Sequence, residues 1–149
     1  MNTARARLNA LLEGTRPPGI YRWTSRAHPA AMRRELATVE WGCHLLDGRT
    51  ATDRTRFFDA CAESLALPAW FGRNFDALAD CLTDLSWLAG RGHVLLWQQY
   101  GVFADHDPDG WDLARDVFAD AAAQRVRTEL APLYVLLRGH GPTDRLPVL

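Results

Sequence analysis

Four short apolar runs, rich in Val, Leu, Ile and aromatic residues, are spaced along the chain and read as strands. They are IYRW, CHLLDG, GHVLLWQQY and PLYVLLRG, at residues 20–23, 43–48, 92–100 and 132–139. Helical patterns separate them, and two parallel strands need such a crossover between them. The spacing therefore predicts an α/β fold in which helices flank a small parallel sheet of three or four strands.

Segments with helical periodicity lie between and beside these runs. They cover residues 28–41, 53–65, 74–85 and 111–126. Three of these helices follow a residue that can cap a first turn: His28 or Ser25, Thr52 or Asp53, and Asn74. On the last helix we expect an inward face of Leu113, Val117, Phe118 and Ala121. The preceding segment ADHDPDG, residues 104–110, is expected to be a loop.

The length of 149 residues, 48% of them hydrophobic, fits one globular domain with a core. We expect residues 1–19 to form an N-terminal arm with a short helix over 4–12. Residues 20–142 are expected to form the domain, with residues 143–149 as a loosely held tail.

The cellular setting can be inferred from what the sequence contains near its start and among its cysteines. The first residues hold no apolar run of signal-peptide length, and no segment is long and apolar enough to span a bilayer. The thiols of Cys43, Cys61 and Cys81 lack metal-site spacing and lie in apolar segments. We therefore expect a cytoplasmic protein with reduced cysteines and no membrane association.

Charge is distributed unevenly although the formal net charge is only −1. Residues 1–40 carry seven Arg and three Glu, a net charge of +4, whereas residues 68–120 carry three Arg and nine Asp, a net charge of −6. An acidic body repels nucleic acid and attracts a basic partner. The distribution therefore argues against nucleic-acid binding.

Aspartates recur at helical spacing inside the acidic part of the chain. Asp76 and Asp80 lie four residues apart, so they share one helix face, and Asp84 extends the row. Like charges at this spacing destabilise a helix by about 0.2–0.5 kcal/mol. A second row follows at Asp112, Asp116 and Asp120. With Trp70 in the loop before the first row, the pattern predicts a binding face for a cationic partner.

Two other readings of the carboxylates remain open at this point. Paired carboxylates can serve as acid and base in a hydrolase, which requires one of them in an apolar pocket. Alternatively, Asp105, Asp107, Asp109 and Gly110 match the opening of a calcium-binding EF-hand loop, with Asp116 at its twelfth position. However, the segment before that loop reads as a strand, and the five histidines lack metal-ligand spacing. We therefore expect no metal and no cofactor.

The run LALPAWFGRNFDALADCLT, residues 65–83, resembles the signature of the barstar family, small intracellular inhibitors of secreted ribonucleases. The segments HLLDG, VLLWQQY, ARDVFADA and LYVLL extend this resemblance over a core at residues 43–138. The resemblance implies a barstar-like α/β fold. It also implies that Trp70, Asp76 and Asp80 enter the active-site cleft of a nuclease, with the aspartates in the place of substrate phosphates, and that Asp120 contacts the enzyme.

The function implied by this resemblance is inhibition rather than catalysis. We expect a monomer that forms a 1:1 complex with a secreted ribonuclease of the guanyl-specific type. The expected partner-binding residues are Trp70, Phe71, Asn74, Asp76, Ala79, Asp80, Thr83, Asp84 and Asp120. The chain departs from the family pattern at Arg73, Ala79 and Asp84. A related module that captures another basic toxin or a regulatory partner is the alternative.

Overall fold

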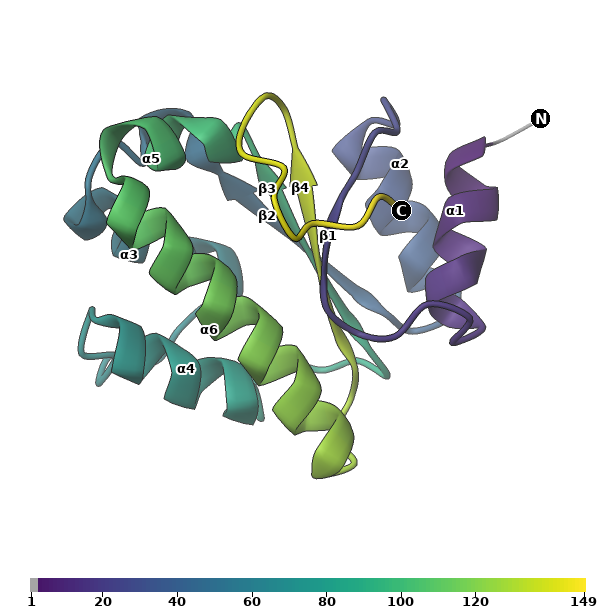
Figure 1. Cartoon of the computed structure of the whole chain (residues 1–149). Helices are drawn as coiled ribbons and strands as arrows, with labels where there is room; N and C mark the ends of the chain where they lie inside the picture. The colour runs from purple at the N-terminus through teal and green to yellow at the C-terminus, as the bar shows by residue number, and fades with distance from the viewer. Residues whose placement is uncertain (1–2) are drawn as a thin grey trace.

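A four-stranded parallel sheet forms the centre of the molecule in the computed structural model, which describes the backbone of residues 3–149 and the side chains of residues 6–149 (Figure 1). The strands are β1 (Ile20–Arg22), β2 (Gly42–Asp47), β3 (His93–Gln98) and β4 (Leu133–Arg138), in the order β1-β4-β3-β2. The predicted α/β fold with a small parallel sheet is therefore confirmed. The central strands β3 and β4 are buried along nearly their whole length, as expected for a sheet covered on both faces.

Four helices cover one face of the sheet: α3 (Arg54–Leu65), α4 (Phe75–Asp84), α5 (Tyr100–His106) and α6 (Pro108–Arg127). Asp53 caps α3, because its carboxylate accepts a hydrogen bond from the backbone N–H of Arg56 at 2.8 Å. The core on this side is aromatic. The ring of Phe57 stacks on Phe103 with centroids 4.5 Å apart, and both rings contact the buried Trp97 of β3.

Two helices cover the opposite face, α1 (Thr3–Leu12) and α2 (Pro29–Ala37). His28 caps α2 by accepting a hydrogen bond from the backbone N–H of Ala30, and Pro29 occupies the first helical position as predicted. Leu8 and Leu11 of α1 are buried in a second core cluster together with residues of α2 and the sheet. The segment expected to be an arm is thus packed against the body of the protein.

The C-terminal residues are also packed, contrary to the expectation of a loosely held tail. The backbone N–H of Arg22 donates to the carbonyl of Pro147 at 2.8 Å, and the N–H of Leu149 donates to the carbonyl of Arg22 at 3.0 Å. Leu146 and Leu149 are buried. The segment therefore closes the outer edge of β1, where an open strand would leave backbone groups unpaired.

The segment ADHDPDG is not a loop, and this corrects the prediction. Residues through His106 complete α5, and Asp107 then caps α6, whose first residue is Pro108. The Asp107 carboxylate accepts hydrogen bonds from the Gly110 N–H at 2.9 Å and from Arg54 Nε at 2.6 Å. Those bonds hold the pKa of the Asp107 carboxyl below its usual value. The aspartates are therefore spread over two helices and do not form an EF-hand loop.

An early start of α6 also changes which of its residues face inward. Trp111, Ala114, Phe118 and Ala121 are buried, whereas Leu113, which was predicted to face inward, is 44% exposed. The buried positions follow the three-and-four spacing that a helix stripe requires, and Leu113 falls outside it.

Candidate binding face

The loop between α3 and α4 displays one aromatic side chain and buries the next. Trp70 is 65% exposed, whereas Phe71 is 7% exposed and packs edge-on against Phe58 of α3, with ring centroids 6.1 Å apart. Phe71 is therefore an anchor in the core, and its expected place in the binding face stays a prediction that this burial does not favour. Its burial fixes the loop so that Trp70 is held out in solvent.

Helix α4 begins at a cap that the sequence predicted. Asn74 Oδ1 accepts a hydrogen bond from the backbone N–H of Ala77 at 2.7 Å. Asp76 lies in the first turn, where the positive end of the helix dipole favours a carboxylate. The cap and the dipole together support a carboxylate at this position without a cationic side chain.

The aspartates of α4 lie opposite its buried stripe. Leu78, Cys81 and Leu82 face the core. Asp76, Asp80 and Asp84 are exposed, and Ala79 and Thr83 are half-buried between them. The three aspartates thus follow one side of the helix, as their spacing predicted.

The nearest arginine in the sequence does not neutralise this row. Arg73 Nη1 forms an ion pair with Asp59 of α3 at 2.7 Å. Over the part of the chain that the structure describes, no cationic side chain lies within ion-pair distance of Asp76 or Asp80. The carboxylates of this row also act on the neighbouring Cys81. Burial raises the pKa of its thiol, and the carboxylates of Asp80 and Asp84 raise it further.

The last two residues expected in the face are partly engaged within α4 itself. The Thr83 hydroxyl donates to the helix carbonyls of Ala79 and Asp80, each at 3.0 Å. Asp84 Oδ1 accepts a hydrogen bond from the backbone N–H of Ser86 at 3.2 Å, which shapes the turn after the helix. Asp76 and Asp80 are the carboxylates of this row without such a bond among the described residues.

The second row of aspartates, on α6, differs from the first because it has an arginine. The guanidinium of Arg115 lies 3.3 Å from Asp112 and 3.5 Å from Asp116, and the Arg115 side chain is only 14% exposed. Asp120 is exposed and has no ion pair within the described residues. Helix α6 packs along α4, so both rows belong to the same layer of helices (Figure 1).

A buried arginine joins the two helices, and sequence reasoning missed it. Arg125, 3% exposed, donates from Nε to the carbonyl of Ala131 at 2.8 Å. Its Nη1 donates to the carbonyls of Leu82 and Asp84 at 3.2 and 3.0 Å. Burial lowers the pKa of this guanidinium, and the Asp84 carboxylate opposes that effect. Its position seven residues after Phe118, on the buried stripe of α6, was the signal available in the sequence.

No metal centre is assembled from the side chains that the structure describes. There, no group of three or more His, Cys, Asp and Glu residues is placed to hold a metal ion. His93 is buried, and its Nδ1 lies 3.4 Å from Nε2 of His44. Burial, followed by the neighbouring His44, lowers the pKa of His93 to about 4. Cys61 and Cys81 are buried free thiols, and Cys43 is a half-buried one.

Comparison with known proteins identifies the family of this fold and face. A family model described as Barstar (barnase inhibitor) matches residues 41–138, about two thirds of the chain. The chain therefore belongs to the barstar family, whose members are inhibitors and not enzymes. Comparison with curated proteins gives no match. Within the described residues, no helix is long and apolar enough to cross a membrane.

Proposed function

We propose that this protein binds a secreted ribonuclease of the guanyl-specific type and blocks its active site inside the producing cell. The proposal rests on membership of the barstar family and on the unpaired carboxylates of α4. Trp70, Asn74, Asp76, Ala79, Asp80, Thr83, Asp84 and Asp120 form the proposed contact set. Phe71 supports this set from the core.

The observation that carries the proposal is the absence of an internal cation beside Asp76 and Asp80 among the described residues. A ribonuclease cleft must be cationic to hold RNA, and two carboxylates one helical turn apart can occupy the positions of phosphates. Unlike RNA, a row of carboxylates on a helix has no phosphodiester bond that the nuclease could cleave. Because the helix is already formed, little ordering is needed on binding.

The aromatic side chain of Trp70 complements this charge. Trp is enriched among the residues that dominate binding energy, because it covers a large area with few rotatable bonds. Trp70 is held out by the buried Phe71, in the loop that leads directly into α4. We therefore assign Trp70 to the apolar part of the contact and Asp80 to the charged part.

A titration tests this function directly. The purified chain is added in increasing amounts to a guanyl-specific ribonuclease, and RNA cleavage is followed. We expect activity to fall in proportion to inhibitor and to vanish at one chain per nuclease. A double variant, Asp76→Asn with Asp80→Asn, serves as the control, because it keeps the shape of the face and removes its charge. It should fold and fail to inhibit.

The identity of the target is tested separately. The chain is used to capture proteins secreted by the same organism, and the captured proteins are identified by mass spectrometry. A ribonuclease that the wild-type chain retains and the double variant releases supports the proposal. A basic toxin without ribonuclease activity, retained in the same charge-dependent way, would instead support the alternative partner. Equal capture by both chains would contradict the assigned face.

A further inference from the structure

The two outer edges of the sheet differ in how they are covered. The edge at β1 is closed by the C-terminal segment through the hydrogen bonds of Arg22 with Pro147 and Leu149. The edge at β2 has no neighbouring strand in the part of the chain that the structure describes. An open edge strand presents unpaired backbone groups to which another strand can add.

The register of β2 identifies the groups that point outward. Gly42 pairs with His93, and its N–H donates to the carbonyl of Gly92 at 3.0 Å, so Gly42 faces β3. Because direction alternates along a strand, the backbone groups of Cys43, Leu45 and Asp47 face away from the sheet. Among the described residues, Arg33 Nε donates to the Cys43 carbonyl at a long 3.4 Å, and the Asp47 carbonyl begins the 3-10 turn Gly48–Thr50 that follows the strand.

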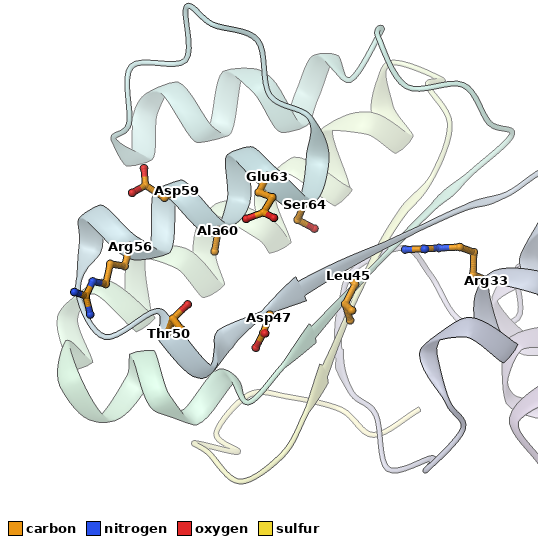
Figure 2. A pocket seen from close by; sticks show the side chains of 9 residues that line it. All are labelled: Arg33, Leu45, Asp47, Thr50, Arg56, Asp59, Ala60, Glu63 and Ser64. Atoms are coloured by element: carbon orange, nitrogen blue, oxygen red, sulfur yellow. The ribbon is translucent and has the colours of Figure 1, made fainter.

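A groove of about 620 Å³ runs along this edge (Figure 2). Leu45 and Asp47 of β2 lie in it, α3 borders one side, and Arg33 of α2 borders the other end. The α3 side chains lie toward the Asp47 end of the groove, and Arg33 lies beyond Leu45 (Figure 2).

The charges along the edge favour a second copy of this chain as the occupant. Arg33 contacts the backbone at Cys43, and Asp47 lies at the other end, so the two charges lie on opposite sides of Leu45. A two-fold axis at Leu45 makes the copies antiparallel and sets Cys43 of one opposite Asp47 of the other. Arg33 of each copy then meets Asp47 of its partner, which is the self-complementarity that a two-fold interface requires.

We infer that this chain dimerises through antiparallel pairing of the outer edges of β2, with Leu45 on the two-fold axis. In such a ladder, the facing Leu45 pair exchanges two backbone hydrogen bonds, and the Asp47 N–H of each copy faces the Cys43 carbonyl of the other. In the single chain, Asp47 forms an ion pair with Arg49, and the two side chains are 46% and 76% exposed. An ion pair this exposed contributes little stability, so Asp47 can leave Arg49 to pair with Arg33 of the second copy. A foreign basic peptide is less well matched, because Arg33 and Arg56 line the same groove as Asp47, Asp59 and Glu63.

This inference does not depend on the proposed function, since it uses β2 and α2 and not the acidic row of α4. It replaces the expectation of a monomer, and the expected ratio of one nuclease bound per chain is unchanged.

The test is analytical ultracentrifugation of the full chain from micromolar to submillimolar concentration. We expect a monomer–dimer equilibrium. Leu45→Pro, which removes the central outward N–H, should leave only monomer. A cooperative thermal unfolding transition of the variant verifies that it folds.

Exchanging the charges of Arg33 and Asp47 tests whether these residues act across the dimer interface or only stabilise the fold of each chain. Arg33→Glu and Asp47→Arg should each weaken dimerisation about tenfold or more, because like charges then face each other across the axis. The double variant should recover dimerisation to within a few-fold of the wild-type chain. Arg34→Glu, at the exposed neighbour of Arg33 outside the groove, should change nothing.

Two results would overturn the inference. One is a chain that stays monomeric over the whole concentration range. The other is a dimer that survives Leu45→Pro and is indifferent to the exchange of Arg33 and Asp47.

Discussion

The two aspartate rows of this protein have the same spacing and different surroundings. On α6, Arg115 lies between Asp112 and Asp116 and contacts both carboxylates. On α4, Asp76 and Asp80 have no cationic neighbour among the described residues, because Arg73 turns to Asp59. Spacing alone therefore does not distinguish a neutralised surface from one that can bind a cationic partner. The distinguishing feature is the position of a single arginine.

The unpaired row has an energetic cost that its counterpart avoids. Like charges one turn apart destabilise a helix by about 0.2–0.5 kcal/mol, and an ion pair within the helix, such as that of the largely buried Arg115 with the exposed Asp112, recovers a similar amount. In α4 the repulsion is left uncompensated by any recorded ion pair over the described residues. A cost of this kind at an exposed surface is consistent with selection for binding and not for stability. The predictions below test that difference.

The largest expected effect concerns Arg125, which holds the two rows in one layer. Arg125→Leu should lower the free energy of unfolding by about 3 kcal/mol, because one buried and two part-buried carbonyls, in α4 and in the segment before β4, lose their donor. Chemical denaturation measures this change. Arg127→Ala is the matched control, since Arg127 is exposed near the end of the same helix and, among the described residues, donates its side-chain hydrogen bonds to Gln124. Equal stability of the two variants would show that Arg125 does not join the helices.

The next effect concerns Asp80, in the middle of the unpaired row. Asp80→Ala should weaken binding to the target nuclease by more than about 2 kcal/mol, which is about thirtyfold in Kd. The free variant should be as stable as the wild-type chain or slightly more so, because one repulsion is removed. Calorimetric titration gives the affinity, and thermal unfolding gives the stability. An unchanged Kd would remove Asp80 from the binding face.

A smaller effect is expected at Trp70, and it should be mainly kinetic. Trp70→Ala should raise the dissociation rate about tenfold and change the association rate much less, since steering depends on charge. Surface plasmon resonance resolves the two rates. The exposure of Trp70 predicts an unchanged melting temperature. Destabilisation of about 3–5 kcal/mol, typical of a core aromatic, would be incompatible with this role.

The smallest effect should come from the paired row. Asp116→Ala should change the affinity for the nuclease by less than about 0.5 kcal/mol, because Arg115 already neutralises this carboxylate and Asp112 remains beside it. The same titration that is used for Asp80→Ala checks it. If both variants weaken binding to the same extent, the contrast between the rows does not matter for function.

Much of this fold could be predicted from local patterns. The strands and the helices with caps at Asp53 and Asn74 were identified because apolar periodicity and cap chemistry act within a few residues. Helix α5 was missed, since its seven residues follow β3 almost directly and share its apolar character. The start of α6 was placed late, because the string of aspartates before it resembles a loop or a metal motif.

The sequence predicted which charged residues lie on the binding face, but it did not predict the contacts that these residues and their neighbours make within the protein. The spacing of Asp76 and Asp80 placed both on one face, as the structure shows. The burial of Phe71 and the pairing of Arg73 with Asp59 could not be predicted, because both depend on how α3 packs against the loop. The same is true of Arg125, because two of its acceptors, the carbonyls of Leu82 and Asp84 in α4, lie more than forty residues away in the sequence.

Because Trp70 is exposed, its intrinsic fluorescence can report on binding. All six tryptophans lie in the described part of the chain. Trp23, Trp97 and Trp111 are buried, Trp41 and Trp87 are half-buried, and Trp70 stands in solvent. A water-borne quencher such as iodide therefore reaches the Trp70 indole ahead of the others, and the red edge of the emission spectrum belongs mainly to this side chain. Entry of Trp70 into a nuclease cleft shields it from the quencher and shifts that emission to the blue, without any attached dye.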